Sequence, residues 1–481
     1  MNLFQKDKMD LHPSSDSSIR NARLQQKSYK RHPLFTGTLI LSGAGLLTRL
    51  IGFYNRIYLS QLIGAKEMGI YQLIFPVYMI AFAFCCHGIE LALSQMTASF
   101  AGQGKPAVHC RILVRTGTAL SLISSLFFSL LIYHYAEFIS IVLLKEETSS
   151  ICLKLMAPVL PFTAIRCCLH GYYLGLKKTA VPAAGQLIEQ SVRVLIIWLI
   201  AESYGKYRTF SAALAVCGMV IGELAGTIYT YISYKIQIYT NHSQKNTKPP
   251  FIEKKPGPKP FKNSSRPCLP YGRELLGRAV PLTATKLSLT LFSSVESVLI
   301  PFMLTSYYKD QDLALSLYGV LTGMALPFIL FPSTLTNSLS VMLLPAMSEA
   351  KASGNKKQIQ TTIKKTVKLC LFLGFTALAF FFLFGKKLGI SVFHEQTAGD
   401  FLFILSFLCP FLYLASSGAS ILNGLGFMKE AFFYSITGIL IRICFILFAI
   451  PKAGIQGYLI GLLAAYLVLT GLQWNKIRRS L

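Results

Sequence analysis

The sequence predicts an all-α polytopic membrane protein with about twelve transmembrane helices, which form two parallel six-helix repeats around a central cavity. The first observation is the composition, because 53% of the 481 residues are hydrophobic and only 14% are charged. Such values are typical of integral membrane proteins. The second observation is a series of apolar segments long enough to cross a hydrocarbon core of roughly 30 Å. The third is an internal repeat with a spacing of about 250 residues.

The apolar segments fall into two sets of six. The first set covers residues 34–63, 69–100, 109–135, 150–175, 180–201 and 209–235. The second set covers residues 274–305, 313–345, 361–391, 399–424, 428–450 and 454–475. Several segments exceed the ~20 residues that a span requires, so we expect them to tilt, bend or continue into the cytosol. Gly52 and Pro76 are the candidate bends.

The segments outside these two sets are polar. Residues 1–33 have mixed charges and no signal-peptide core, and we predict a disordered cytosolic tail. Residues 236–273 combine seven prolines with lysines, which predicts an extended cytosolic linker between an N-terminal bundle (34–235) and a C-terminal bundle (274–475). Residues 476–481 form a second short tail. The linker is expected to be a tether or, alternatively, a docking site for a partner.

The basic residues are distributed unevenly about the membrane. The two tails and the loops on their side hold 32 of the 47 lysines and arginines, the opposite loops hold 8, and the spans hold 7. Loops rich in lysine and arginine stay in the cytosol, so both termini should be cytosolic. The net charge of +27 therefore reflects topology, and we expect no nucleic-acid partner.

Short similarities relate the two halves of the chain. The pairs are Pro161-Phe162 with Pro410-Phe411, Arg193 with Arg442, Gly104-Lys105 with Gly354-Asn355, and Gly171, Gly175 and Lys177 with Gly424, Gly426 and Lys429. Because six spans per unit is an even number, both halves enter the membrane in the same orientation. Two parallel bundles that face each other over a central cavity suit alternating access.

No catalytic, cofactor-binding or metal-binding motif stands out. The chain has no phosphate-binding loop, zincin motif or nucleophile elbow, so we do not expect an enzyme. Most of the eleven cysteines lie in spans without the spacing of zinc ligands, and we expect them to be packing residues. We expect neither a cofactor nor a metal. His87, within an apolar span, is a packed or cavity-lining residue or, alternatively, a proton relay.

Besides the charged residues toward their ends, the apolar segments contain eleven ionisable residues. The basic ones are Arg49, Arg56, Lys154, Arg166, Arg193, Lys286 and Arg442, and the acidic ones are Glu90, Glu189, Glu223 and Glu296. A charge at the centre of a bilayer costs roughly 2.5–3.5 kcal/mol on insertion scales, so a chain retains it where it faces a partner or a wet cavity. The basic surplus indicates an anionic cargo.

Helical spacing suggests roles for these residues. Arg49 and Arg56 are seven positions apart, share a helix face and have no acid on their own span, so we expect them to face the cavity. Glu189 and Arg193 are four positions apart and can pair. Alternatively, the buried charges are satisfied ion pairs that hold the bundles together. We predict substrate binding by Arg49, Arg56, Arg193, Lys286 and Arg442, and ion coupling or ion pairing by Glu90, Glu189, Glu223 and Glu296.

Six short motifs occur in order along the chain. They are Arg49–Arg56 (RLIGFYNR), Ile63-Gly64, Gly69–Tyr71 (GIY), Gln186–Val194 (QLIEQSVRV), Gly222–Ala225 (GELA) and Pro345–Ala350 (PAMSEA). Together they resemble the stage V sporulation protein B family of polysaccharide exporters, within the multidrug, oligosaccharidyl-lipid and polysaccharide flippase superfamily. The resemblance implies a V-shaped pair of bundles that moves a lipid-linked saccharide from the inner to the outer leaflet.

The related lipid II flippases share part of this pattern. Their first-helix arginines line the cavity, and Arg49 and Arg56 occupy similar positions. They also have a cavity arginine in the eighth helix, whereas the matching stretch Tyr318–Gly323 has none. Two further helices form a groove for the lipid tail in those flippases, and here no apolar segment follows the twelfth.

The expected function is that of a flippase in the bacterial cytoplasmic membrane. Its cargo would be an anionic lipid-linked oligosaccharide, such as a peptidoglycan or spore-cortex precursor. The expected partners are this substrate, membrane lipids and cell-wall synthesis proteins. The alternative is a cation-coupled multidrug antiporter of the same superfamily, which would favour a carboxylate-rich cavity. A membrane-embedded glycan ligase or polymerase is a further alternative, but the external loops are too short for it.

Overall fold

The computed structural model describes residues 33–103, 106–204, 210–243, 269–333 and 356–480, together with positions 336, 343 and 347. The regular secondary structure in these ranges is helical, and they contain no strand. Ten helices are long and apolar enough to cross a membrane, or eleven if one bent pair counts as a single span. The prediction of an all-α polytopic membrane protein is therefore confirmed.

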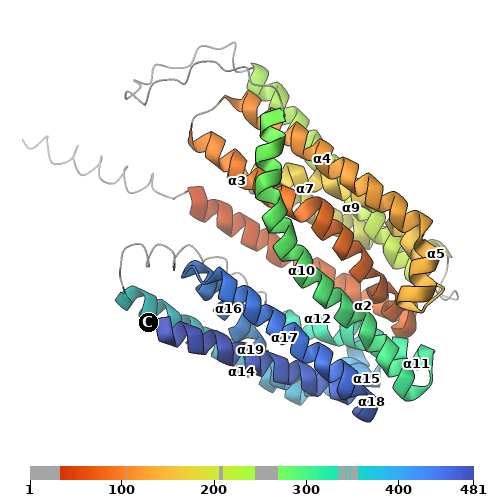
Figure 1. The fold of residues 1–481 in the computed structure, drawn as a ribbon. Coiled ribbons are helices and arrows are strands. Elements are labelled where there is room, and N and C mark those ends of the chain that lie inside the picture. Colours follow the sequence, from red (N-terminus) through yellow and green to blue (C-terminus); the bar gives the residue numbers. More distant parts are fainter. Residues whose placement is uncertain are drawn as a thin grey trace, which may run out of the picture.

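The first two predicted spans form a helical hairpin. It consists of α2 (Pro33–Phe82), a π-helical turn η1 (Ala83–His87) and α3 (Gly88–Gly102). Its apolar part, Gly43–Gly102, has 60 residues, which at 1.5 Å per residue is about 90 Å of helix, or three bilayer cores. The chain reverses within α2 near Gly64, which has φ 77° and ψ 177°, and returns toward the end where it began (Figure 1). Both predicted spans therefore fit within this stretch.

The break in α2 lies elsewhere than we expected. Only Gly64 departs from helical torsion angles within α2, so the predicted bend at Gly52 is not found. The backbone conformation of Gly64 is open to glycine and strained for other residues. Gly52 allows close packing instead, because a Cβ there would lie 3.6 Å from Oε1 of Gln190 on the fifth span. Pro76 lies inside the helix.

The remaining spans of the first set follow the predicted segments closely. They are α4 (Ala107–His134), the pair α6 (Ser149–Met156) and α7 (Val159–Gly175) with a bend of 43°, α8 (Ala180–Tyr204) and α9 (Ala212–Ser243). The short α5 (Ala136–Phe138) and π-helical η2 (Ile139–Leu144) connect α4 to α6.

The second set begins with α10 (Leu269–Tyr308), α11 (Gln311–Gly319), π-helical η4 (Val320–Ala325) and α12 (Leu326–Leu330). It continues with α14 (Lys356–Phe393), α15 (Gln396–Leu405), the 3-10 turn η5 (Ser406–Leu408) and α16 (Cys409–Gly424). It ends with α17 (Met428–Phe448), α18 (Ile450–Ala453) and α19 (Ile455–Ser480).

The helices form two groups that separate toward one end of the molecule (Figure 1). In the first group α8 packs on α9 and α2, and α7 packs on α3 and α4. In the second, α14 packs on α15 and α16, and α19 packs on α16 and α17. α10 contacts both groups, since it packs on α2 and α3 as well as on α11 and α17. The start of α2 and the end of α19 lie at the end where the groups separate.

The central linker is shorter than predicted. α9 continues to Ser243 and α10 begins at Leu269, so the helices include residues 236–243 and 269–273, which we expected to be extended. The hydroxyl of Thr240 donates to the carbonyl of Ile236, one helical turn earlier. The remainder of the linker and the predicted tail at 1–32 lie outside the described residues.

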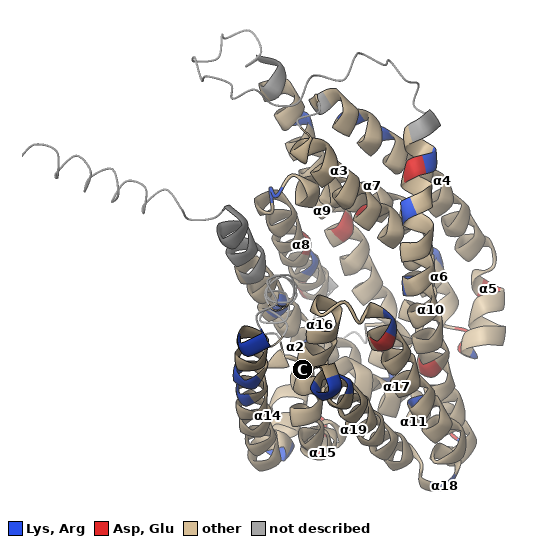
Figure 2. Cartoon of the chain, turned by 60° about the vertical axis from the view of Figure 1, so that its left-hand side comes forward, with Lys and Arg blue, Asp and Glu red and all other residues tan. Residues whose placement is uncertain are grey.

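Basic side chains gather at the end of the second group that carries the C-terminus (Figure 2). The first turns of α14 contribute exposed lysines at positions 356, 357, 364, 365 and 368, and the last turn of α19 contributes Arg478 and Arg479. Ile359 and Ile363 bury the other face of α14 against Ile421 and Leu422 of α16. The start of α14 is therefore amphipathic, as expected for a segment at a membrane surface.

Candidate functional site: paired and unpaired charges inside the spans

Four buried charges of the first helix group form one network, here called the first ion cluster. Arg166 of α7 donates from Nε and Nη2 to both carboxylate oxygens of Glu223 on α9, at 2.8 and 2.7 Å. Its Nη1 lies 3.0 Å from Oε2 of Glu189 on α8. Glu189 also accepts from Nη2 of Arg193, one helical turn further along α8, at 2.5 Å. The cluster thus ties three spans together.

Glycines on α9 allow this cluster to form. A Cβ at Gly222 would lie 2.7 Å from the carbonyl oxygen of Glu189, and one at Gly226 would lie 3.2 Å from that of Gly185. Both glycines are one helical turn or less from Glu223, so α8 and α9 approach closely where the charges lie. The GELA motif therefore has a structural reason, because its glycine brings the following glutamate to the arginine.

The second helix group contains a separate ion pair. Arg442 of α17 donates from Nε and Nη2 to the two oxygens of Glu296 on α10, at 2.7 and 2.8 Å. The hydroxyl of Tyr458 on α19 also donates to Glu296, at 3.0 Å. The ring of Tyr466 lies 6.0 Å from the guanidinium carbon of Arg442. A two-pronged contact of this kind satisfies a desolvated guanidinium and fixes α10 on the second group.

The predicted site residues therefore divide into two classes. Arg193, Arg442, Glu189, Glu223 and Glu296 are neutralised by partners inside the bundles. Arg49, Arg56 and Lys286 have no ion pair in the part of the chain that the structure describes. Lys154 pairs with Glu137 at 2.6 Å, and both side chains are exposed.

The unpaired arginines lie along the first half of α2. Arg49 is exposed, whereas Arg56 is partly buried and donates from Nη1 to the carbonyl of Thr322 in η4, at 3.4 Å. Because α2 packs on α8, Arg56 also lies near enough to Arg193 for the two charges to repel. A guanidinium without a carboxylate partner keeps its net positive charge and can bind an anion. Lys286 is exposed on α10.

Glu90 is the candidate acid outside the ion pairs. It lies on α3 near Arg166 and Cys167, and it forms no ion pair within the described ranges. His87 lies one turn earlier, at the end of η1, and is half-buried. Glu90 therefore lies at the edge of the first ion cluster, whereas His87 lies near Lys286 of α10. No group of three or more possible metal ligands occurs among the described residues.

His170 of α7 is a buried polar residue that sequence reasoning did not single out. It is 8% exposed, and its Nε2 has no hydrogen-bond partner within the described structure. The neighbouring Gly171 and Gly175 explain this, since a Cβ at these positions would lie 2.4 Å from the carbonyl of Glu90 and 2.6 Å from that of Ser94. The close α3–α7 packing covers His170. The two glycines one helical turn apart, Gly171 and Gly175, were the feature of the sequence that could have indicated this close packing.

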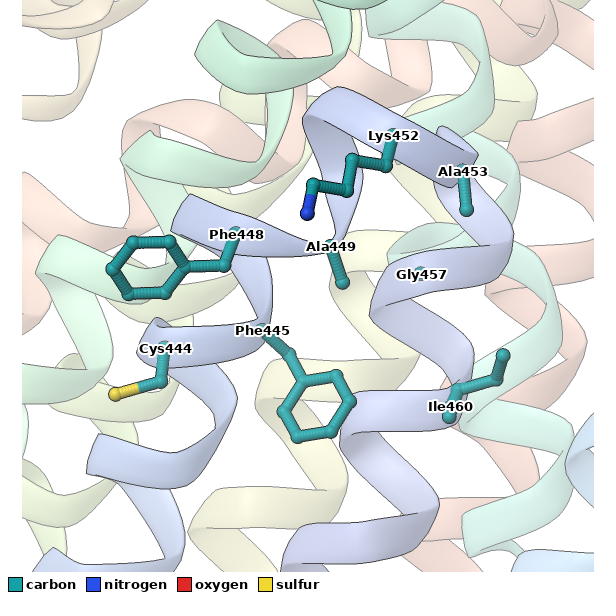
Figure 3. A pocket seen from close by; sticks show the side chains of 8 residues that line it. All are labelled: Cys444, Phe445, Phe448, Ala449, Lys452, Ala453, Gly457 and Ile460. Atoms are coloured by element: carbon teal, nitrogen blue, oxygen red, sulfur yellow. The ribbon is translucent and has the colours of Figure 1, made fainter.

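Two cavities in the second helix group are apolar. One has a volume of 380 Å³ and is lined by Cys444, Phe445, Phe448, Ala449, Lys452, Ala453, Gly457 and Ile460 (Figure 3). The other, of 260 Å³, lies between α14, α16 and α19. None of the nine predicted site residues lines either one. The predicted central cavity stays a prediction.

Comparison with known proteins gives the family. Residues 34–351 match the family described as polysaccharide biosynthesis protein. The chain belongs to this family. It is 26% identical to stage V sporulation protein B of Bacillus subtilis (strain 168), over 91% of this chain and 80% of that protein. It is 21% identical to the lipid II flippase MurJ of the same organism, over 85% of this chain and 76% of that protein.

Solved transporter structures share the fold of this family member. An inward-facing multidrug resistance transporter of the MATE family aligns with a TM-score of 0.67 and 14% identity, covering 90% of this chain and 94% of the other. An inward closed conformation of the lipid II flippase MurJ aligns with the same TM-score and identity, covering 92% and 87%. The protein therefore has a membrane-transporter fold with family similarity to polysaccharide biosynthesis proteins.

Proposed function

We propose that this polysaccharide biosynthesis protein is a flippase for an anionic lipid-linked oligosaccharide, of the class that supplies peptidoglycan or spore cortex. One observation carries the proposal. Of the five arginines predicted inside the spans, Arg166, Arg193 and Arg442 have carboxylate partners, whereas Arg49 and Arg56 have none in the described part of the chain. Unneutralised guanidinium groups on a membrane helix suit a phosphate-bearing cargo.

The cargo chemistry assigns roles to the basic residues. The planar forks of Arg49 and Arg56 would bind the pyrophosphate oxygens, and Lys286 on α10 would add a point charge. Arg193 and Arg442, which we first expected to bind substrate, would instead hold their helices in place through Glu189 and Glu296. The polyprenyl tail would stay in the bilayer, because leaving lipid for protein gains no hydrophobic free energy there.

Transport would follow from a change in the angle between the two helix groups. The basic ends of α14 and α19 indicate that the end where the groups separate faces the cytosol. In this state the headgroup would enter from the inner leaflet. Rocking of one group against the other would then expose it to the outer side. Both termini would be cytosolic, with 34–235 and 274–475 as the two moving units.

A cation-coupled multidrug antiporter is the second candidate. The similarity of fold to a multidrug resistance transporter favours it, as does Glu90, for which the described ranges contain no ion pair. However, Glu189, Glu223 and Glu296 are each occupied by an arginine, so little acidic charge remains for a cationic drug. The charge balance therefore favours the anionic cargo.

Reconstituted vesicles with a lipid-linked precursor test the proposal. Flipping is measured per inserted molecule, from the accessibility of the headgroup. Arg49→Ala and Arg56→Ala should abolish flipping while insertion stays normal, and Arg49→Lys should retain part of it, since lysine keeps the charge and loses the fork. Lys154→Ala is the matched control, because it removes a basic residue from an exposed pair. Wild-type turnover in both arginine-to-alanine variants would contradict the proposal.

A further inference from the structure

The two helix groups touch backbone to backbone at the end opposite the termini. A Cβ at Gly69 of α2 would lie 2.1 Å from the carbonyl oxygen of Leu315 on α11. A Cβ at Gly319 would lie 2.1 Å from the carbonyl oxygen of Ala65 and 2.5 Å from the amide nitrogen of Gly69. Real Cβ atoms do not approach backbone atoms so closely, so the helices would have to move apart to admit even one methyl group. We call this contact, Ala65–Gly69 against Leu315–Gly323, the glycine closure.

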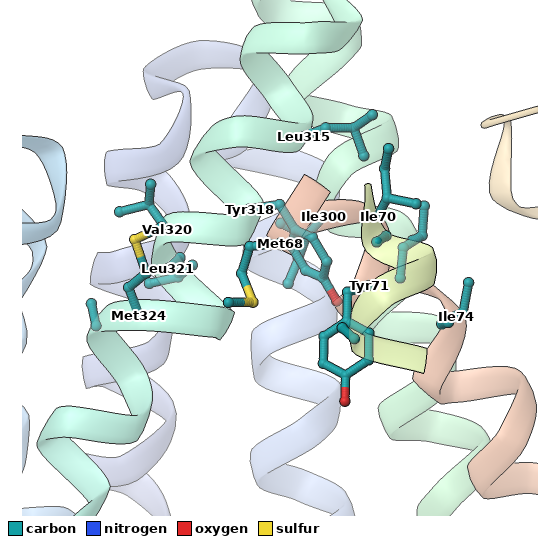
Figure 4. Close-up of a cluster of buried hydrophobic side chains, with 14 of the residues drawn as sticks. Met68, Ile70, Tyr71, Ile74, Ile300, Leu315, Tyr318, Val320, Leu321 and Met324 are labelled. Carbon is teal, nitrogen blue, oxygen red and sulfur yellow. The ribbon is translucent and has the colours of Figure 1, made fainter. Parts of the chain in front are cut away.

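Large apolar side chains extend the glycine closure and seal it (Figure 4). Met68 is fully buried and points at Gly323, where a Cβ would lie 2.2 Å from its Cγ. Leu315, Tyr318 and Leu321 of the facing segment are at most 2% exposed. A dry, close-packed contact of this kind leaves no passage for a sugar headgroup.

Polar contacts surround the glycine closure and also join the two groups. Nζ of Lys66 lies 2.7 Å from Oδ1 of Asp312. Nε2 of Gln61 donates to the carbonyl of Val392 at 2.6 Å. Nε2 of Gln311 donates to the carbonyl of Lys145 at 2.6 Å. The Lys66 and Asp312 side chains are 42% and 67% exposed. An exposed ion pair adds little stability, so this contact can separate readily.

Arg56 reaches the same contact from the proposed cargo site. Its guanidinium donates to the carbonyl of Thr322, which belongs to η4, the π-helical segment that packs on α2. A π-turn disturbs the regular hydrogen-bond ladder of a helix and is frequent at functional sites. Arg56 therefore connects the region where the anion would bind to η4, the segment that would move when the two groups separate.

We infer that the glycine closure is the gate of this protein and that Arg56 couples it to the cargo. When phosphate oxygens accept the hydrogen bonds of the Arg56 guanidinium, its hydrogen bond to the carbonyl of Thr322 is lost. The closed state then has one contact fewer between the two groups. A ligand shifts a conformational equilibrium by the difference in its affinity for the two states, so a bound phosphate favours opening. The coupling rests on the proposed function, whereas the gate itself does not.

Spin labels can report the opening. Cysteines replace Tyr135 and Lys452, which are exposed and belong to the two different groups, and serine replaces the exposed Cys444. The distance between the labels is measured in lipid nanodiscs. Gly69→Ala and Gly319→Ala should shift the distribution to longer distances without any ligand. Gly277→Ala and Gly471→Ala are matched controls, since nothing lies within 4 Å of a Cβ at either position, and should leave it unchanged.

Charge reversal provides an independent test if the glycine variants fail to insert. Lys66→Glu places two carboxylates together and should lengthen the distances, and adding Asp312→Lys should restore them. Unchanged distributions in the inserted Gly69→Ala and Gly319→Ala proteins, or in Lys66→Glu where those two fail to insert, would overturn the gate.

The coupling is tested with undecaprenyl pyrophosphate as the added ligand. It should lengthen the distances in the wild type. Arg56→Ala should start with longer distances and respond no further, whereas Arg49→Ala should start at the wild-type distribution and respond less. A wild type that flips the precursor but shows no response to this ligand would overturn the coupling alone. Gate opening in the glycine variants without any flipping by the wild type would instead refute the proposed function.

Discussion

Arg166 and Arg56 are both partly buried arginines on apolar helices, but their surroundings give them different roles. Arg166 contacts two carboxylates, whereas Arg56 contacts a backbone carbonyl. An arginine with two acids has no positive charge to spare and is satisfied by the protein itself. An arginine that lies beside another arginine and lacks an acid is suited to an external anion. The partner, and not the residue type, separates structural from ligand-binding charge here.

At the residue scale, removing one acid from the first ion cluster should destabilise the protein. Glu223→Gln would leave Arg166 in a buried site with one partner fewer, and losing a partner from a buried ion pair costs about 3–5 kcal/mol. Thermal unfolding of the purified protein in detergent measures the loss. Glu137→Gln, in the exposed pair with Lys154, should unfold like the wild type. Equal stability of the two variants would show that the first ion cluster is not a structural element.

At the element scale, single glycines determine how the helices break and pack. Gly64 allows two spans to form within one long apolar stretch, and Gly222 and Gly226 allow α8 and α9 to approach. These roles are different, because Gly64 is required for its torsion angles and the others for their small size. Without these glycines, α2 would have no break at position 64, and α8 and α9 could not pack so closely. The positions of glycine therefore help to shape the first helix group.

Substitution of Gly64 tests whether this position requires glycine for its backbone torsion angles or for its small size. Nothing lies within 4 Å of a Cβ at Gly64, so Gly64→Ala would clash with nothing and should destabilise the hairpin by about 1–3 kcal/mol through backbone strain alone. Gly45→Ala, in the same helix and equally unobstructed, should be neutral or slightly stabilising. Thermal unfolding of both variants in detergent checks this. An unchanged midpoint for Gly64→Ala would mean that the reversal does not require glycine.

At the scale of the whole molecule, two helix groups meet at one end and separate at the other. The glycine closure joins the groups at the far end, and α10 packs on helices of both groups. Such an assembly can change the angle between its halves without repacking either one. The buried ion pairs lie within the first group or join α10 to α17 of the second group, so they can persist while the groups move. The exposed pair of Lys66 with Asp312 joins the two groups and would separate.

The orientation of this assembly is a prediction from the charge distribution. Reporter domains fused after Glu147 and Asp312 should be external, and those fused after Lys178 and Lys357 should be cytosolic, because the basic loops stay inside. An activity assay with a reporter that works only outside, paired with one that works only inside, reads each site. Reversal at any of the four sites would contradict the model of two parallel six-span units.

The sequence by itself determined the features that depend on one segment at a time. Hydropathy located the spans, since apolar length is a local property, and spacing of four positions on one helix predicted the contact of Glu189 with Arg193. The matched positions of Arg193 and Arg442 were also visible in the chain.

Only the tertiary structure decided which charges have partners. Arg442 finds Glu296 across 146 positions of sequence, and Arg166 finds Glu223 across 57, distances over which no helical period carries information. The contact of Gly69 with Leu315 and the link from Arg56 to Thr322 arise in the same way, from two segments brought together by packing. Periodicity predicts which face a side chain occupies, but the neighbour on that face depends on how the helices assemble.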